Sequence, residues 1–241
     1  MNTDIGAIRR FTRCPHLYFL HDVEKVPLVP NLKMVLGRVV KLCIDTMIMW
    51  RNQSILGDVF ALARDVTEGV FQKDIAYTDA EAARGVRYHL TVIGQQAGAL
   101  ASLWRGAIQR QLHTPCEVNV PFERTIGHHV VSGFADIKEL SQTRSTSVRS
   151  RRPDDRAAPD PTLIIIADAG GRHQLDFLVS TNPPGVRRIV YEFTSEHWQQ
   201  TIDRLDVMER AVERGVYAPT DPQNWKCAGC LLRSVCRYVS A

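Results

Sequence analysis

Apolar residues recur at helical spacing through the first half of this chain. From 36 to 50 they stand three and four positions apart, which predicts a helix with one wide apolar face. Asp58 and Thr78 stand where helix caps are expected, and a glutamate three residues after Thr78 completes the pattern of a capping box. The predicted helices cover residues 5–11, 16–20, 36–50, 59–70 and 79–111.

At Cys116 the pattern changes to alternation of apolar and polar residues, which is typical of strands. Gly127 indicates a turn between the first two strands, and Ser195 can cap a last helix that Gly215 ends. Residues 141–160 are rich in Ser, Pro, Asp and Arg and poor in apolar residues, so we predict a flexible surface loop there. The predicted strands cover residues 116–122, 129–140, 162–168, 174–180 and 188–194.

This order of elements predicts an α+β fold with a mixed sheet and a helical N-terminal half. A chain of 241 residues can bury a sizeable core, and we expect a single domain over 1–241. Its parts are a mainly helical segment at 1–115, a sheet core with the final helix at 116–215, and a cysteine-rich tail at 216–241.

The composition points to an ordinary globular protein, with 44% hydrophobic and 23% charged residues. Charged side chains interrupt the most apolar stretch too often for a membrane span, and no secretory segment is evident near the start. We therefore expect a cytoplasmic protein with no membrane association. The net charge is only +4, so a basic surface for nucleic acid has to be local.

Three of the six cysteines crowd into ten residues near the end of the chain, which indicates a metal ligand set. They are Cys227, Cys230 and Cys236. Structural zinc and cubane clusters both need four ligands, so one is missing. Cys43 lies in a helical apolar stripe and Cys116 begins an alternating strand, which makes both simpler to read as core residues. Cys14, just before Pro15 at a helix break, is the better fourth ligand; the alternative is a set of incidental cysteines.

An early Cys-Pro, at Cys14-Pro15, combined with a C-terminal Cys-x2-Cys-x5-Cys resembles the iron–sulfur RecB-like nucleases of the PD-(D/E)XK superfamily. These include CRISPR-associated RecB-like exonucleases, the nuclease domain of AddB and many phage proteins. Further motifs follow in the family's order, namely Gly37-Arg38-Val39-Val40-Lys41, Gly133-Phe134-Ala135-Asp136 and Val190-Tyr191-Glu192-Phe193-Thr194. The resemblance implies a restriction-endonuclease-like core stapled by a 4Fe–4S cluster. The ligands it implies are Cys14, Cys227, Cys230 and Cys236, and spacing alone leaves zinc as the alternative.

The same resemblance implies a nuclease site that has lost part of its chemistry. Asp136 and Glu192, on adjacent strands, would hold Mg²⁺ or Mn²⁺, which polarises a phosphate and activates a water. Lys41 stands in place of the family's histidine and Thr194 in place of its lysine, while Gln200 is a weak match to a later glutamine. We therefore expect catalysis to be impaired or lost. The competing interpretation is an active Mg²⁺- or Mn²⁺-dependent exonuclease in which Lys41 has taken over the lysine's role.

The expected partner is DNA, as ends or single strands, and the alternative role is a non-catalytic subunit of a larger nucleoprotein complex. Several arginines are candidates for phosphate contacts, or else belong to a solvated charged surface. They are Arg149, Arg151, Arg152, Arg187 and Arg188. His128 and His129 invite a metal interpretation, although two solvated histidines beside a turn is the simpler one. His197 is a weaker candidate ligand of the same kind.

Overall fold

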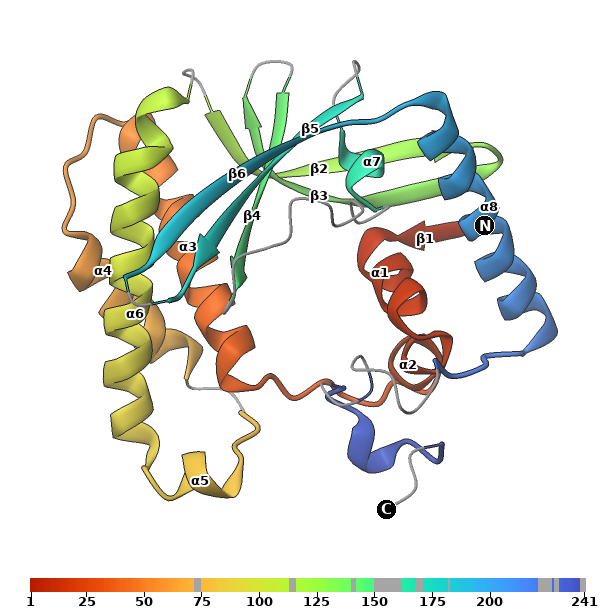
Figure 1. The fold of residues 1–241 in the computed structure, drawn as a ribbon, viewed down its shortest axis with the longest axis horizontal. Helices are drawn as coiled ribbons and strands as arrows, with labels where there is room; N and C mark the ends of the chain where they lie inside the picture. Colours follow the sequence, from red (N-terminus) through yellow and green to blue (C-terminus); the bar gives the residue numbers. More distant parts are fainter. Residues whose placement is uncertain are drawn as a thin grey trace.

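The protein folds around a six-stranded mixed sheet with helices gathered at its two ends (Figure 1). The computed structural model describes residues 1–71, 75–112, 116–139, 142–149, 162–167, 171–181, 183–220, 227 and 230–238. The fold is therefore α+β, as the order of the elements predicts.

The sheet is built on a long hairpin, whose strands β2 and β3 pair antiparallel around a turn at Gly127. The strand order is β1-β3-β4-β5-β6, with β2 paired to β3 outside this path. β1 runs parallel to β3 and β4 runs parallel to β5, while the other pairs are antiparallel. The strands are β1 (Asn2–Asp4), β2 (Cys116–Ile126), β3 (His129–Glu139), β4 (Gln142–Arg149), β5 (Arg172–Val179) and β6 (Gly185–Glu192).

One edge of β3 is shared by two different strands. β1 pairs with residues 130–132 and β4 pairs with residues 137–139. Between these pairings, residues 133–136 of β3 have β2 on one side and no described strand in register on the other. Asp136 lies in this gap, where β3 and β4 begin to separate.

A first group of helices, α3 (Leu32–Asn52), α4 (Val59–Val70) and α6 (Val86–Ala107), encloses one apolar core against the sheet. The Asp58 side chain caps α4, and the predicted capping box at Thr78 is present. That box opens only the short helix α5 (Asp79–Ala82), because Gly85 adopts a left-handed φ of 76° before α6 begins. Among the described residues, each helix is too short or too polar to cross a bilayer.

A second apolar core lies at the other end of the sheet, around α1 (Ile5–Arg13) and α8 (Ser195–Arg214). Between α1 and the first group of helices come α2 (Pro15–Tyr18) and a π-helical turn, η1 (Phe19–Val23). The described residues also include two short 3-10 helices, η2 (Gln109–Gln111) and η3 (Arg233–Val235). Gly215 ends α8 in the left-handed conformation, as predicted.

Two predictions made from the sequence, for residues 141–160 and 162–168, are wrong. The loop predicted at 141–160 begins with β4 (Gln142–Arg149), which pairs with β3 and β5, so its polar residues form an interior strand. The remainder of that segment, 150–160, lies outside the described residues. The strand predicted at 162–168 is instead the short helix α7 (Thr162–Ile166), whose five residues are all buried.

Candidate functional site

The ammonium group of Lys41 lies beside Asp136, the residue in the gap along β3. Lys41 lies on α3, and its Nζ is 3.6 Å from Oδ1 of Asp136 on β3. It also lies 2.9 Å and 3.1 Å from the two carboxylate oxygens of Asp45, one helical turn further along α3. Asn119 Oδ1 of β2 accepts a third hydrogen bond from Lys41, at 2.9 Å. The Lys41 ammonium therefore contacts two carboxylates and one amide oxygen, which come from α3, β2 and β3.

Asn119 is held in this arrangement from both sides of its amide. Its Nδ2 donates to Asp45 Oδ2 at 2.8 Å while its Oδ1 accepts from Lys41. Its backbone has a φ of 52°, a left-handed conformation that asparagine tolerates better than most residues. Only 8% of the Asp45 side chain is exposed, so its charge depends on these partners. The sequence motifs did not single out Asp45 or Asn119; the four-residue spacing from Lys41 to Asp45 was the available signal.

The strand beside Asp136 carries no second acidic ligand. β4 reads Gln-Thr-Arg-Ser-Thr-Ser-Val-Arg, without a carboxylate or a lysine. The contact that β4 makes with Asp136 is a backbone one, from the N–H of Thr146 to Oδ2 at 3.4 Å. The second carboxylate close to Asp136 therefore comes from α3, as Asp45, and it is already bound to Lys41.

Glu192 does not join this group. It ends β6, and β4 and β5 lie between β6 and β3 in the sheet, so the expectation that Asp136 and Glu192 stand on adjacent strands is wrong. The Glu192 side chain is 74% exposed and forms an ion pair with Arg172 of β5 at 3.5 Å. A divalent cation bound at Asp136 would not have Glu192 as a ligand in this arrangement.

The positions expected to mark a lost lysine and a retained glutamine also lie elsewhere. Thr194 is the N-cap residue of α8, in a reciprocal capping arrangement with His197, whereas Ser195 was the predicted cap. The Gln200 side chain donates to Glu196 on the exposed side of α8, at 3.4 Å. Neither residue is brought to Lys41.

The four cysteines predicted as ligands face one pocket where the tail returns to the first helices. The pocket is also lined by His16, Leu17 and Thr220. The backbone N–H of Thr220 donates to Cys14 Sγ at 3.4 Å, and the Cys227 thiol donates to the Thr220 carbonyl at 3.7 Å. Burial, together with the charges of the other three sulfurs, raises the pKa of Cys227. The cysteines lining the pocket are Cys14, Cys227, Cys230 and Cys236.

These sulfurs are not drawn onto a single point. Among the described residues, the His, Cys, Asp and Glu group whose ligand atoms all lie within 4.8 Å of one another is formed by His128, His129 and Glu209. Around one zinc ion at about 2.3 Å from each sulfur, all four thiolates would be closer than that. Each thiolate of a cubane instead binds a different iron, which holds the sulfurs further apart. The four sulfurs as described therefore do not form the ligand set of a single zinc ion.

The candidate arginines have different environments. The Arg149 guanidinium at the end of β4 lies over the Phe177 ring, 5.9 Å from its centroid. Arg188 of β6 is half-buried, and its Nε donates to the buried Asp176 at 3.0 Å. Arg187, its neighbour on β6, is half-buried and also has polar or electrostatic contacts of its own. Arg151 and Arg152 lie outside the described residues.

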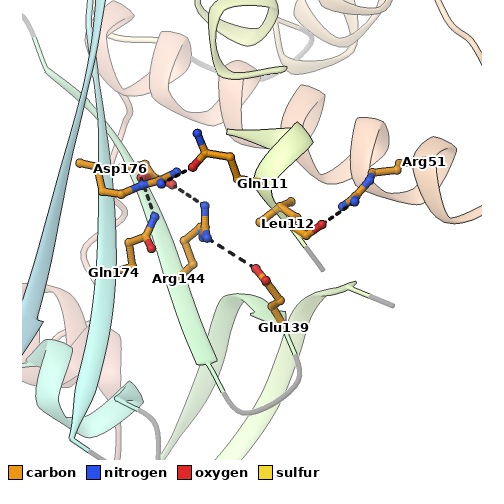
Figure 2. A network of polar contacts seen from close by, with 8 residues as sticks. Arg51, Gln111, Leu112, Glu139, Arg144, Gln174 and Asp176 are labelled. Atoms are coloured by element: carbon orange, nitrogen blue, oxygen red, sulfur yellow. Dashed lines mark hydrogen bonds and ion pairs between the residues drawn. The ribbon is translucent and has the colours of Figure 1, made fainter. Parts of the chain in front are cut away.

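A second set of charges, which sequence reasoning missed, is buried inside the sheet. Arg144 of β4 lies between Glu139 of β3 and Asp176 of β5, at 3.5 Å and 3.4 Å (Figure 2). The side chains of all three are at most 6% exposed. Burial lowers the pKa of the Arg144 guanidinium, against the opposing effect of the two carboxylates. The available signal was a single aspartate, Asp176, within the otherwise apolar run at 175–179 of β5.

Comparison with known proteins supports the fold. No protein-family model and no curated protein sequence matches this chain. A crystal structure from Eubacterium rectale, described as a "putative exonuclease", is similar over 93% of this chain and 86% of that chain, with a TM-score of 0.53 and 12% identity. The crystal structure of SSO0001 covers 90% of this chain and 89% of its own at 12% identity, but its TM-score of 0.34 carries no argument. At such low identity the likeness concerns the fold alone, and it shows that the two chains share an α+β fold.

Proposed function

We propose that this protein binds DNA ends or single-stranded DNA through a nuclease-like fold whose cleavage site is filled by its own lysine. One observation carries the proposal: the Lys41 ammonium lies among Asp45, Asn119 and Asp136, the oxygen-bearing side chains that a catalytic cation would need. The likeness to the exonuclease structure supports the choice of nucleic acid as the partner.

The positive charge of Lys41 explains how Asp45 and Asp136 can stay close together without a bound metal ion. Two carboxylates facing each other in a partly buried gap are costly unless a cation lies between them. An ammonium removes that cost, but it has no vacant coordination position with which to polarise a phosphate or to lower the pKa of a bound water. The site is therefore stabilised electrostatically and is unable to activate a nucleophile in the manner of a metal.

Removal of the ammonium tests this directly. We expect the wild-type protein to cleave single-stranded DNA negligibly with Mg²⁺ or Mn²⁺, and to bind no Mn²⁺ at Asp136 by electron paramagnetic resonance. Lys41→Ala should expose the carboxylates and create a Mn²⁺ site that Asp136→Asn removes. Lys33→Ala, on an exposed position of the same helix, is the matched control and should behave as wild type. A Lys41→Ala protein that folds but gains no Mn²⁺ binding would contradict the proposal.

A second candidate function is favoured by the distance between Lys41 and Asp136. At 3.6 Å, Lys41 is close enough to stabilise charge next to a metal held by that aspartate, as a catalytic lysine does. In that case the wild-type protein is an active Mg²⁺- or Mn²⁺-dependent nuclease, and Lys41→Ala abolishes cleavage instead of creating a metal site. If wild type neither cleaves nor binds DNA, the remaining role is that of a non-catalytic subunit in a nucleoprotein complex.

We also propose that Cys14, Cys227, Cys230 and Cys236 hold a 4Fe–4S cluster. The support is that the four thiols line one pocket, and that Thr220 donates a backbone hydrogen bond to one of them. Anaerobically purified protein should be brown, with iron and sulfide in equal amounts, and Cys14→Ser should lose the colour and unfold at a lower temperature. Cys43→Ser is the matched control for colour and iron content, since that thiol is buried elsewhere. A colourless protein with zinc on the same cysteines would refute the cluster and keep the ligand set.

A further inference from the structure

Two histidines and two carboxylates converge where the β2–β3 turn meets α8. His128 Nε2 lies 2.8 Å from Glu209 Oε2 and 4.0 Å from Asp206 Oδ1. His129 Nε2 lies 2.7 Å from Asp206 Oδ1. The ligand atoms of His128, His129 and Glu209 all lie within 4.8 Å of one another. The donors come from the turn on one side and from successive turns of α8 on the other.

The burial of His129 sets this group apart from an ordinary surface cluster. His129 is 0% exposed, so the interpretation of two solvated histidines is wrong for this residue. Its Nδ1 is buried and, among the described residues, has no hydrogen-bond partner. The centroids of the two imidazole rings are 3.9 Å apart, so the two rings lie side by side.

The two carboxylate oxygens of Glu209 have different partners. Its Oε1 lies 2.8 Å from the amino group of Met1, while its Oε2 is directed toward His128. Oε2 therefore remains available to a cation without breaking the contact with Met1. Asp206 is bonded to His129, in the manner of the carboxylates that orient metal-binding histidines.

We propose that His128, His129 and Glu209 form a binding site for a divalent transition-metal ion of the zinc class, with Asp206 orienting His129 or acting as the fourth ligand. Two imidazole nitrogens with carboxylate oxygens suit zinc and its neighbours better than Mg²⁺ or Ca²⁺, which prefer oxygen ligands throughout. On binding, the metal replaces the hydrogen bond between His128 Nε2 and Glu209 Oε2.

Such a site would fasten the β2–β3 turn to α8. Without a metal, the turn already contacts α8 through these polar groups. It also packs closely at Gly127, where an added Cβ would lie 3.3 Å from Ile202. The site uses other residues than Lys41 and its partners, and other residues than the cysteine pocket. The inference therefore does not rest on the proposed function.

The test compares metal binding by variants that share the same cysteines. Zn²⁺ stoichiometry is measured for wild type, His128→Gln and Glu209→Gln, with Glu213→Gln, an exposed position on the next turn of α8, as the control. We expect wild type and Glu213→Gln to bind about one ion per chain more than the other two variants. Co²⁺ at this site should give d–d bands without the sulfur-to-metal charge transfer that thiolates produce.

Imidazole ¹⁵N spectra of the wild-type protein provide a readout that needs no variant. Addition of Zn²⁺ should shift ring nitrogens of His128 and His129 and leave those of half-buried His197, which is bonded to Thr194, unchanged. Equal stoichiometry in all four proteins, or histidine resonances that do not respond to Zn²⁺, would overturn the proposal and leave the group as a hydrogen-bonded cluster.

Discussion

Replacement of Arg144 by methionine should be among the most destabilising single changes in the sheet. Methionine keeps most of the volume of the side chain and removes its charge. It leaves Glu139 without its guanidinium contact, and leaves Asp176 with Arg188 at 3.0 Å and the Gln174 amide at 3.1 Å. Breaking a buried ion pair by removing one partner costs about 3–5 kcal/mol.

The geometry places Arg144→Met at the lower end of this range. The two contacts of Arg144 are 3.4 Å and 3.5 Å long, which is long for charge-assisted hydrogen bonds, and Asp176 keeps a second arginine. We therefore expect a loss of about 3 kcal/mol, which corresponds to a fall in Tm of roughly 6–12 °C for a domain of this size. Equilibrium unfolding in urea measures the free energy, with the m-value checked for constancy.

The matched control is Arg172→Met, on the neighbouring strand β5. Its partner Glu192 is 74% exposed and Arg172 is 57% exposed, at a distance of 3.5 Å. Exposed pairs of this kind contribute about 0–1 kcal/mol. Losses that are equal for the two variants would refute the reasoning that burial decides the effect. In the Arg144→Met background, Glu139→Gln should recover part of the stability, because it removes one of the two buried negative charges that Arg144 faced.

Three further outcomes follow from the described contacts. Burial raises the pKa of Cys43 to about 12 and of Cys116 to about 11, so both thiols should resist alkylation at pH 8 until the chain is unfolded. The unfolded chain releases these protons near pH 9 and the folded chain retains them, so stability should fall as pH rises above about 9. Gly133→Ala should cost about 1–3 kcal/mol in urea unfolding, since its Cβ would lie 2.7 Å from Ile5 Cγ2. Arg149→Ala should weaken single-stranded DNA binding in fluorescence anisotropy and reduce the salt slope by about 1, whereas unchanged affinity would remove Arg149 from the interface.

Local signals in the sequence predicted those elements that local chemistry determines. The caps at Asp58 and Thr78 and the helix end at Gly215 are present, because each depends on hydrogen bonds within a few residues. The alternation in β2 and β3 is equally local and was also predicted. Cys43 and Cys116 are 0% and 1% exposed, which confirms their interpretation as core residues.

Elements determined by their neighbours in space were the ones predicted wrongly. The strand β4 is polar in sequence, and its place in the sheet comes from pairing with β3 and β5 on its two sides. The short apolar run at Thr162–Ile166 looked like a strand but folds as a helix buried against the second core. Periodicity does not separate these two states for five residues.

The candidate site was predicted only in part, again because its contacts join segments that are far apart in the sequence. Lys41 and Asp136 were identified from the order of short motifs, and the structure brings them together. Glu192 was paired with Asp136 because its motif matches the family's order, but β4 and β5 intervene in the sheet. Asp45, which does lie beside Lys41, belongs to no motif, and its role follows only from the packing of α3 against β2.

The charges around Lys41 also determine where DNA can bind. Asp45 and Asp136 together carry two negative charges against one positive charge from Lys41, so the group keeps a net charge of about −1 when no further cation is present. Asp136 and Lys41 are 28% and 32% exposed, and a phosphate that approached them would therefore meet repulsion. In the proposed function, the attraction for DNA has to come from basic residues elsewhere, such as Arg149 at the end of β4. Lys41→Ala without added metal should accordingly weaken DNA binding at low salt, because it makes the group more negative, and Mn²⁺ should reverse that loss.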